Sequence, residues 1–162
     1  MAISRMNHAV LYVRDATRSA AFYQDVLGFR EVAAFPGGAF LQAPDSTNDH
    51  DIAFFSIGPD AGPSTAGRST VGLYHLAWEV PTLSDLVDLR ERLSAAGALV
   101  GASDHGATKS LYAEDPDGLE FEVCWVVPAE FIDPESTPSP RPLPLDLDHE
   151  IARFGPATVG GR

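Results

Sequence analysis

Two stretches of the sequence share one pattern of apolar and polar positions. Residues 6–15 and 73–82 are both rich in β-forming residues and both end in a residue that caps helices. The two stretches align with each other, and His75 falls on His8 at a separation of 67 positions. A repeat of this kind predicts that the chain contains two copies of one structural unit.

A helical pattern follows each of the two capping residues, Asp15 and Thr82. The apolar positions at helical spacing are Ala20, Tyr23 and Leu27 in the first copy and Leu83, Leu86, Val87 and Leu93 in the second. Only Arg90 interrupts the apolar face of the second helix. Gly28 and Gly97 stand where a left-handed residue ends a helix, so we expect the two helices to end there.

Three β-like segments follow each predicted helix. They are residues 29–35, 39–43 and 51–58 in the first copy and residues 98–103, 107–114 and 118–127 in the second. Turn signals at 36–38 and 115–118 separate neighbouring strands, and residues 59–69, rich in Gly, Pro and Ser, connect the copies. The pattern predicts an α+β fold of two tandem βαβββ modules, about residues 5–58 and 70–127, whose strands form a cupped, barrel-like mixed sheet.

The end of the chain differs in composition from the two modules. Residues 128–144 contain six prolines and few apolar anchors, which predicts an extended course over the surface. Residues 145–151 are compatible with a short helix. We therefore expect one domain over residues 1–127 and a tail over 128–162 that packs against the body or a neighbouring subunit and has no catalytic part.

Composition and charge narrow the classes of partner. The 162 residues have a formal net charge of −12, and no cluster of Lys and Arg is present, which argues against nucleic acid or an anionic membrane surface as a partner. No apolar run approaches the roughly 20 residues that span a bilayer, and residues 1–6 do not resemble a secretory signal. We expect a cytoplasmic protein that binds small molecules. The single cysteine, Cys124, excludes an intramolecular disulfide and is expected to line the core or a cavity.

Strand alternation indicates which side chains share a face. Around His75, one face carries Leu73, His75, Ala77 and Glu79, and the other carries Tyr74, Leu76, Trp78 and Val80, which we expect to pack under the helix. The last strand divides into Glu120, Glu122 and Cys124 against Leu119, Phe121, Val123 and Trp125. Glu120 lies next to a turn, so we expect it to be solvated. A carboxylate in mid-strand on an inward face, such as Glu122, is costly unless it is paired or bound to a cation.

Six residues emerge as candidates for a functional site. They are His8, His50, His75, His105, Tyr112 and Glu122. Two imidazoles and a carboxylate from separate strands can hold a divalent metal and leave coordination positions open, and the remaining three can act on what binds there. Simpler interpretations remain open, because a single strand histidine is more often a core or surface residue than a ligand. Histidines in polar loops, such as His50 and His105, are commonly solvated, and Tyr112 fits an ordinary amphipathic strand.

The repeat, its paired histidines and the closing segment resemble a known superfamily. The βαβββ repeat, the histidine of each first strand and residues 115–122, which read DPDGLEFE, look like the vicinal oxygen chelate superfamily of glyoxalase I, bleomycin-resistance proteins and extradiol dioxygenases. The resemblance spans roughly residues 6–127. Within the superfamily the chain most resembles the small single-domain type I extradiol (catechol) dioxygenases.

The resemblance implies a role for each candidate. In such enzymes two His and one Glu bind Fe(II), and by position these are His8, His75 and Glu122. The acid–base His of the family precedes an apolar strand, as His50 does, and its active-site Tyr lies ten residues before the ligand Glu, as Tyr112 does. His105 corresponds to the other active-site His, although its loop is two residues shorter here. Members are often dimers, so a homodimer is expected.

The function implied is ring cleavage of a catechol-type aromatic diol by O2, in aromatic catabolism, with Fe(II), or with Mn(II) or another divalent metal. His50 would take and return a proton, and Tyr112 and His105 would hydrogen-bond the oxygens of the substrate. Three alternatives stay open, one of which is a metal-binding member of this superfamily whose substrate is not a catechol. A glyoxalase-like metal-dependent isomerase or lyase usually takes a fourth ligand, commonly Glu, from the strand that ends the first half, and residues 52–57 offer no carboxylate. A metal-free protein that binds a drug or metabolite needs no intact set of ligands.

Overall fold

The chain divides into two compact units with separate sheets. The computed structural model of the protein describes residues 2–67, 69–132 and 142–161. Unit 1 comprises Met1–Ser64 and Asp115–Gly118, and unit 2 comprises Thr65–Glu114 and Leu119–Arg162. The junction between Ser64 and Thr65 lies within the predicted connector. The expected grouping of residues 1–127 into one domain stays a prediction.

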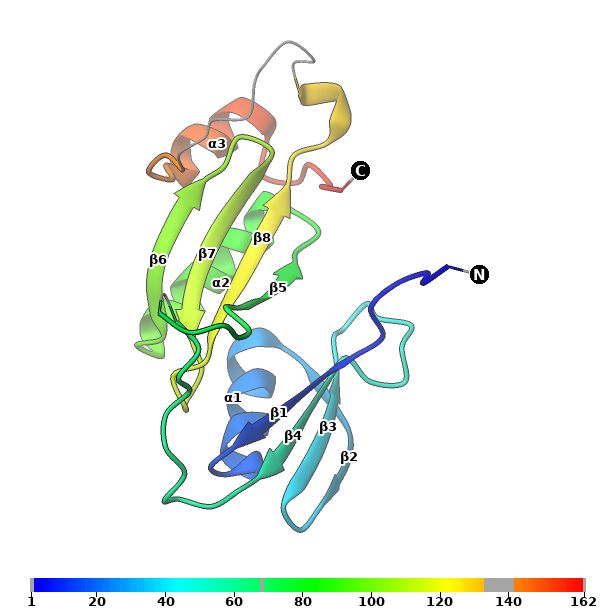
Figure 1. The fold of residues 1–162 in the computed structure, drawn as a ribbon. Helices are drawn as coiled ribbons and strands as arrows, with labels where there is room; N and C mark the ends of the chain where they lie inside the picture. Colours follow the sequence, from blue (N-terminus) through cyan, green and yellow to red (C-terminus); the bar gives the residue numbers. More distant parts are fainter. Residues whose placement is uncertain (1, 68, 133–141, 162) are drawn as a thin grey trace. The chain divides into compact units, whose positions relative to one another are not determined.

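Unit 1 is a βαβββ module. Its elements are β1 (Ala9–Val13), α1 (Ala16–Leu27), β2 (Arg30–Phe35), β3 (Gly38–Gln42) and β4 (Ile52–Ser56). The sheet has the order β1-β4-β3-β2, in which β1 and β4 are parallel and the other pairs are antiparallel. The helix lies along one face of this sheet and contacts β3 and β4 (Figure 1).

Unit 2 repeats this topology. Its elements are β5 (Leu76–Glu79), α2 (Leu83–Ala95), β6 (Leu99–Asp104), β7 (Thr108–Glu114) and β8 (Glu120–Val126). The order β5-β8-β7-β6, with β5 and β8 parallel, is the order of unit 1 with each strand replaced by its counterpart. The predicted α+β fold of two βαβββ modules is confirmed. The pairing produces two four-stranded mixed sheets, and neither closes into a barrel by itself.

Local signals in the sequence set the ends of both helices as predicted. The side chain of Asp15 accepts hydrogen bonds from the backbone N–H groups of Thr17 and Arg18 at the start of α1. Thr82 and Asp85 form a reciprocal capping box at the start of α2. At the other ends, Gly28 and Gly97 adopt the expected left-handed backbone, with φ of +79° and +67°.

Alternation along β5 and β8 separates a buried face from a more accessible one, whereas β2 is exposed along its whole length. In β8 the residues Phe121, Val123 and Trp125 are almost fully buried, whereas the residues between them are half-buried. The same alternation extends along β5 and the residue after it, but Tyr74 is 68% exposed, contrary to expectation. Tyr74 lies two residues before the first paired residue of β5, Leu76, so the alternation of the strand does not extend to it.

The C-terminal segment adds a helix to unit 2. A 3₁₀ turn spans Ala129–Phe131, and the predicted short helix is present as α3 (Leu147–Phe154), which contacts α2. The predicted extended course of residues 128–144 falls largely on 133–141, outside the described residues. None of the helices in the described ranges combines the length and the apolar character needed to cross a membrane.

Candidate functional site

The six predicted site residues fall into two groups, one in each unit. Unit 1 contains His8 and His50, and unit 2 contains His75, His105, Tyr112 and Glu122. Both His8 and His75 directly precede the first strand of their unit instead of lying within it. Each strand begins at the next residue because pairing begins there: the Ala9 N–H donates to the Asp51 carbonyl, and Leu76 pairs with Phe121.

An imidazole–carboxylate pair forms the centre of the unit 2 group. His75 Nε2 lies 3.0 Å from Glu122 Oε2, and the side chains are 22% and 13% exposed. The sheet register explains the pairing, because Glu122 lies opposite Ala77 in the parallel β5–β8 ladder and Ala77 is two residues from His75. Two ligands bound about 2.1 Å from one metal ion at right angles are separated by about 3 Å, so this pair fits adjacent positions on a divalent metal.

Glu120 is a neighbour of His75 that the sequence analysis placed in solvent. Its Oε1 is 3.6 Å from His75 Nδ1, and both atoms are buried without a hydrogen-bond partner among the described residues. Glu120 shares a face of β8 with Glu122 because the two are separated by one residue. His75 therefore has one carboxylate near each ring nitrogen, with the Glu122 oxygen at 3.0 Å from Nε2 and the Glu120 oxygen at 3.6 Å from Nδ1, beyond hydrogen-bond distance.

Tyr112 and His105 are joined by a hydrogen bond at the same face. Tyr112 lies directly opposite Glu122 in the antiparallel β7–β8 register, and its ring centroid is 5.8 Å from that of His75. The Tyr112 hydroxyl and His105 Nε2 are 2.8 Å apart. Burial, together with the charge of Glu122, raises the pKa of Tyr112 to about 12, so the phenol is neutral at pH 7 and able to donate a hydrogen bond.

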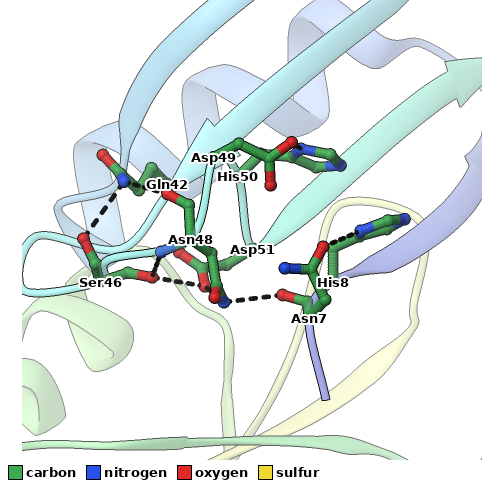
Figure 2. Close-up of polar contacts among 8 residues, drawn as sticks. All are labelled: Asn7, His8, Gln42, Ser46, Asn48, Asp49, His50 and Asp51. Atoms are coloured by element: carbon green, nitrogen blue, oxygen red, sulfur yellow. Dashed lines mark hydrogen bonds and ion pairs between the residues drawn. The ribbon is translucent and has the colours of Figure 1, made fainter. Parts of the chain in front are cut away.

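The unit 1 group consists of two stacked imidazoles. The ring centroids of His8 and His50 are 4.3 Å apart at an interplanar angle of 31°. His50 Nδ1 lies 3.2 Å from Asp49 Oδ2, which leaves Nε2 as the ring nitrogen free to exchange a proton. The pKa of the Asp49 carboxyl lies below its usual range because it accepts a hydrogen bond from the backbone N–H of His50 and lies beside the His50 imidazole. Figure 2 shows His8 and His50 beside the loop that carries His50.

Aromatic side chains adjoin the histidine pair on the face of the sheet opposite α1. Leu41 and Phe54 point into the core under the helix, so alternation directs Phe40 and Phe55 to the other face. Phe40 meets His50 edge-on with centroids 5.0 Å apart and lies 6.0 Å from Phe55. Apolar side chains also remain exposed along β1, at Val10 and Tyr12. This face therefore combines imidazoles with an apolar surface.

Cys124 lies on the polar face of unit 2, and its expected place as a core or cavity-lining residue stays a prediction. It is half-buried on β8, two residues from Glu122. Burial raises the pKa of the thiol to about 11, and the charges of Glu122 and Glu79 add to this. A thiol that is protonated at pH 7 is a poor nucleophile, so the raised pKa does not favour covalent chemistry at Cys124.

The complete set of ligands stays a prediction. In the part of the chain that the structure describes, no three side chains of His, Cys, Asp or Glu lie close enough together to hold a metal ion. His8 belongs to unit 1, whereas His75 and Glu122 belong to unit 2. What unit 2 contributes by itself is a two-ligand pair with a hydrogen-bonded Tyr112–His105 pair next to it.

Sequence reasoning missed several residues that surround the histidines. Asn7, Asn48 and Asp51 hold the loop and strand beside His8 and His50, and Glu120 faces His75. The signal for Glu120 was available, because it alternates in step with Glu122. The loop residues carry no pattern that predicts their contacts, and the hydrogen bond from Asn48 to the Asn7 carbonyl joins positions 41 residues apart.

Comparison with known proteins identifies relatives of the chain. Residues 5–123 match the family model described as the Glyoxalase/Bleomycin resistance protein/Dioxygenase superfamily. Biphenyl-2,3-diol 1,2-dioxygenase 3 from Rhodococcus globerulus is 36% identical over 120 residues, which are 74% of this chain and 62% of that protein. Catechol-2,3-dioxygenase from Bacillus subtilis is 31% identical over 120 residues, 74% of this chain and 41% of that protein. The chain thus matches about two fifths to three fifths of the length of these curated relatives.

A solved structure agrees with this match. The glyoxylase/bleomycin resistance protein/dioxygenase domain from Frankia sp. EAN1pec superposes with a TM-score of 0.63 at 25% identity, over 76% of this chain and 92% of that one. This agreement over most of the chain is consistent with the family match over residues 5–123.

Proposed function

Because the chain belongs to the Glyoxalase/Bleomycin resistance protein/Dioxygenase superfamily, we propose that it is a metal-dependent extradiol dioxygenase. The substrate would be a catechol-type aromatic diol, and the reaction would open its ring beside the hydroxyl groups with incorporation of both atoms of O2. Relatives named as dioxygenases of biphenyl-2,3-diol and catechol, at 36% and 31% identity, support this class of reaction.

The observation that carries the proposal is the unit 2 group. The His75–Glu122 pair supplies one neutral and one anionic ligand, and the Tyr112 phenol lies opposite Glu122 in the sheet register. We propose that His8 of unit 1 completes the ligand set. The metal, Fe(II) with Mn(II) as the alternative, would supply Lewis acidity, open positions for a chelating diol and the redox chemistry that O2 requires.

The protein residues have separate tasks in this proposal. Nε2 of His50 accepts a proton from a substrate hydroxyl and later returns it, a task that suits an imidazole because its pKa is near neutrality. The Tyr112 hydroxyl, neutral because its pKa is about 12, donates a hydrogen bond to a substrate oxygen on which negative charge develops. His105 orients that hydroxyl through the 2.8 Å contact at its Nε2.

The aromatic face of unit 1 supports an aromatic substrate. Phe40 and Phe55 present a partly exposed apolar surface next to His50, and aromatic rings pair favourably at centroid distances of roughly 4.5–7 Å. The glyoxalase-like alternative lacks comparable support. The strand that would provide the fourth ligand is β4, and its residues Ile52–Ser56 contain no carboxylate.

The test is oxygen consumption by anaerobically purified protein reconstituted with Fe(II), on addition of a panel of catechols. We expect oxygen uptake together with a yellow ring-opened product, and loss of both in His75→Ala. The same panel with Mn(II) reports on metal preference. Bound metal without oxygen uptake on any catechol would refute the dioxygenase and favour non-redox chemistry, whereas lack of metal binding would favour a binding protein.

A further inference from the structure

Asp51 organises the loop that carries His50. Its carboxylate is 9% exposed and accepts three hydrogen bonds, from the backbone N–H of Ala43, the hydroxyl of Ser46 and the side-chain amide of Asn48, at 2.8, 2.7 and 2.7 Å. The backbone of Asp51 is also held, because its carbonyl accepts a hydrogen bond from the Ala9 N–H and its N–H donates to the Leu41 carbonyl. A buried carboxylate with this many donors holds the loop in one conformation, since releasing any donor leaves the charge less satisfied.

Asn48 connects this loop to the residue before His8 (Figure 2). Its Nδ2 donates to Asp51 Oδ1 and to the backbone carbonyl of Asn7, both at 2.7 Å. Both partners are acceptors only, so the amide nitrogen must face them. The backbone of Asn48 is held as well, by the hydroxyl of Ser46 and by the side chain of Gln42.

Asn7 then acts on His8 itself. Its Oδ1 lies 2.7 Å from His8 Nδ1. An amide oxygen accepts but does not donate, so the proton of a neutral His8 is placed on Nδ1, and Nε2 carries the lone pair. This is the form in which an imidazole binds a divalent cation through Nε2.

We propose that Asn7, Asn48 and Asp51 form a clamp that positions the two functional histidines of unit 1. The clamp fixes the tautomer of His8 through Asn7 and holds the stacked His8–His50 pair through Asn48, which joins the two chain segments that carry them. His8 is exposed and its ring stacks on that of His50, so the hydrogen bond to Asn7 and this stacking together define its orientation. The three clamp members are positioning residues. The catalytic consequence rests on the proposed function, whereas the effect on the His8 tautomer does not.

The test uses Asn7 variants, because Asn7 is exposed and its side chain is not part of the loop around Asp51. Asn7→Ala removes the acceptor and Asn7→Asp restores it. Asn48→Ala removes both bonds of the bridge. Thr47→Ala is the matched control, since Thr47 is an exposed neighbour in the same loop whose hydroxyl, among the described residues, accepts a hydrogen bond from Arg5 alone, at 3.4 Å.

The main readout is long-range ¹H–¹⁵N NMR of the histidine side chains in metal-free protein at a pH where the imidazoles are neutral. We expect His8 as the Nδ1–H tautomer in the native protein, in Asn7→Asp and in Thr47→Ala. Asn7→Ala and Asn48→Ala should shift the population toward Nε2–H. An unchanged tautomer in both alanine variants would overturn the clamp, as would an Nε2–H form in the native protein.

Turnover of a catechol provides the second readout and separates the two proposals. We expect kcat/KM of Asn7→Ala to fall roughly 10- to 100-fold and that of Asn7→Asp to recover most of the loss, as for other residues that orient a metal-ligating histidine. Native protein with the expected tautomer but no turnover would refute the proposed function and leave the clamp supported. Native turnover that is unaffected in Asn7→Ala, with an altered tautomer, would overturn the positioning role.

Discussion

A buried cation in unit 2 allows a quantitative test of how the C-terminal helix is attached. Lys109 on β7 is 1% exposed, and its Nζ lies 2.6 Å from Asp104 Oδ1 on β6 and 3.0 Å from Glu150 Oε2 on α3. The Glu150 side chain is 5% exposed. The perturbation is Lys109→Met, which keeps an apolar stem and removes the charge.

The expected effect is large because the buried Glu150 carboxylate would lose the Lys109 ammonium and retain the contact of its Oε1 with Nδ1 of the exposed His149, at 2.9 Å. Removing one partner of a buried ion pair typically costs about 3–5 kcal/mol. For a protein of this size each kcal/mol corresponds to about 2–4 °C in Tm, so Tm should fall by roughly 6–20 °C. Adding Glu150→Leu to Lys109→Met removes the unpaired charge and should recover most of the loss.

The pH dependence of the loss identifies its electrostatic origin. Burial raises the pKa of Asp104, but hydrogen bonds from Lys109 and from the backbone of Gly106 outweigh it and lower that pKa below its usual range. A lowered pKa contributes stability above the unfolded value, about 4, and that stability is lost as pH falls through the folded value. The difference between native and Lys109→Met proteins should therefore be largest near pH 7 and shrink below pH ~4.

Urea and thermal unfolding followed by circular dichroism at several pH values measure these quantities. The reasoning would be refuted by a Lys109→Met protein within about 1 kcal/mol of the native one at pH 7, well under the cost of a broken buried pair. A double variant no more stable than the single one would also refute it, because the unpaired Glu150 would not then be the cause.

Three further predictions concern the polar face of unit 2. The raised pKa of Cys124, about 11 instead of 9.0, should slow its alkylation by iodoacetamide at pH 8 about 100-fold relative to an unstructured cysteine peptide, and an equal rate would contradict this. Tyr112→Phe should remove a phenol that ionises near pH 12 in metal-free protein, and kcat should fall roughly 100-fold. The raised pKa of Tyr112 stabilises the fold below pH ~10, and this stabilisation is lost as the pH rises toward 12. Glu120→Ala should weaken Zn²⁺ affinity about 10- to 100-fold in competition with a chromogenic chelator, while Glu114→Ala on the exposed end of β7 should not.

The fold was predictable because its signals are local and repeated. Each predicted strand matches an observed one within a few residues, and the helix ends follow from capping side chains and glycines that act over one turn. The duplication supported each assignment twice. The separation of the strands into two sheets depends on pairing between distant segments, and no periodic pattern in the sequence predicts that pairing.

The site was predictable in part. Alternation placed Glu120, Glu122 and Cys124 on one face, but the expectation that the neighbouring turn leaves Glu120 in solvent did not anticipate its place beside His75. The sequence could not predict the contact of Asn48 with Asn7, because a hydrogen bond between an irregular loop and a residue 41 positions away, just before β1, follows from three-dimensional packing. The roles of His50, His105 and Tyr112 stay predictions, although the Tyr112–His105 hydrogen bond places two of them in contact.

The central claim is that the residues around His75 and Glu122 serve ring cleavage by O2. The most direct measurement is mass spectrometry of the product formed from a catechol under oxygen-18 gas by the Fe(II)-loaded protein. We expect a product that is opened beside the hydroxyl groups and contains two oxygen-18 atoms, and no such product from His75→Ala or Glu122→Ala. Native protein whose product contains no oxygen-18, or variants that form the labelled product as fast as native protein, would contradict it.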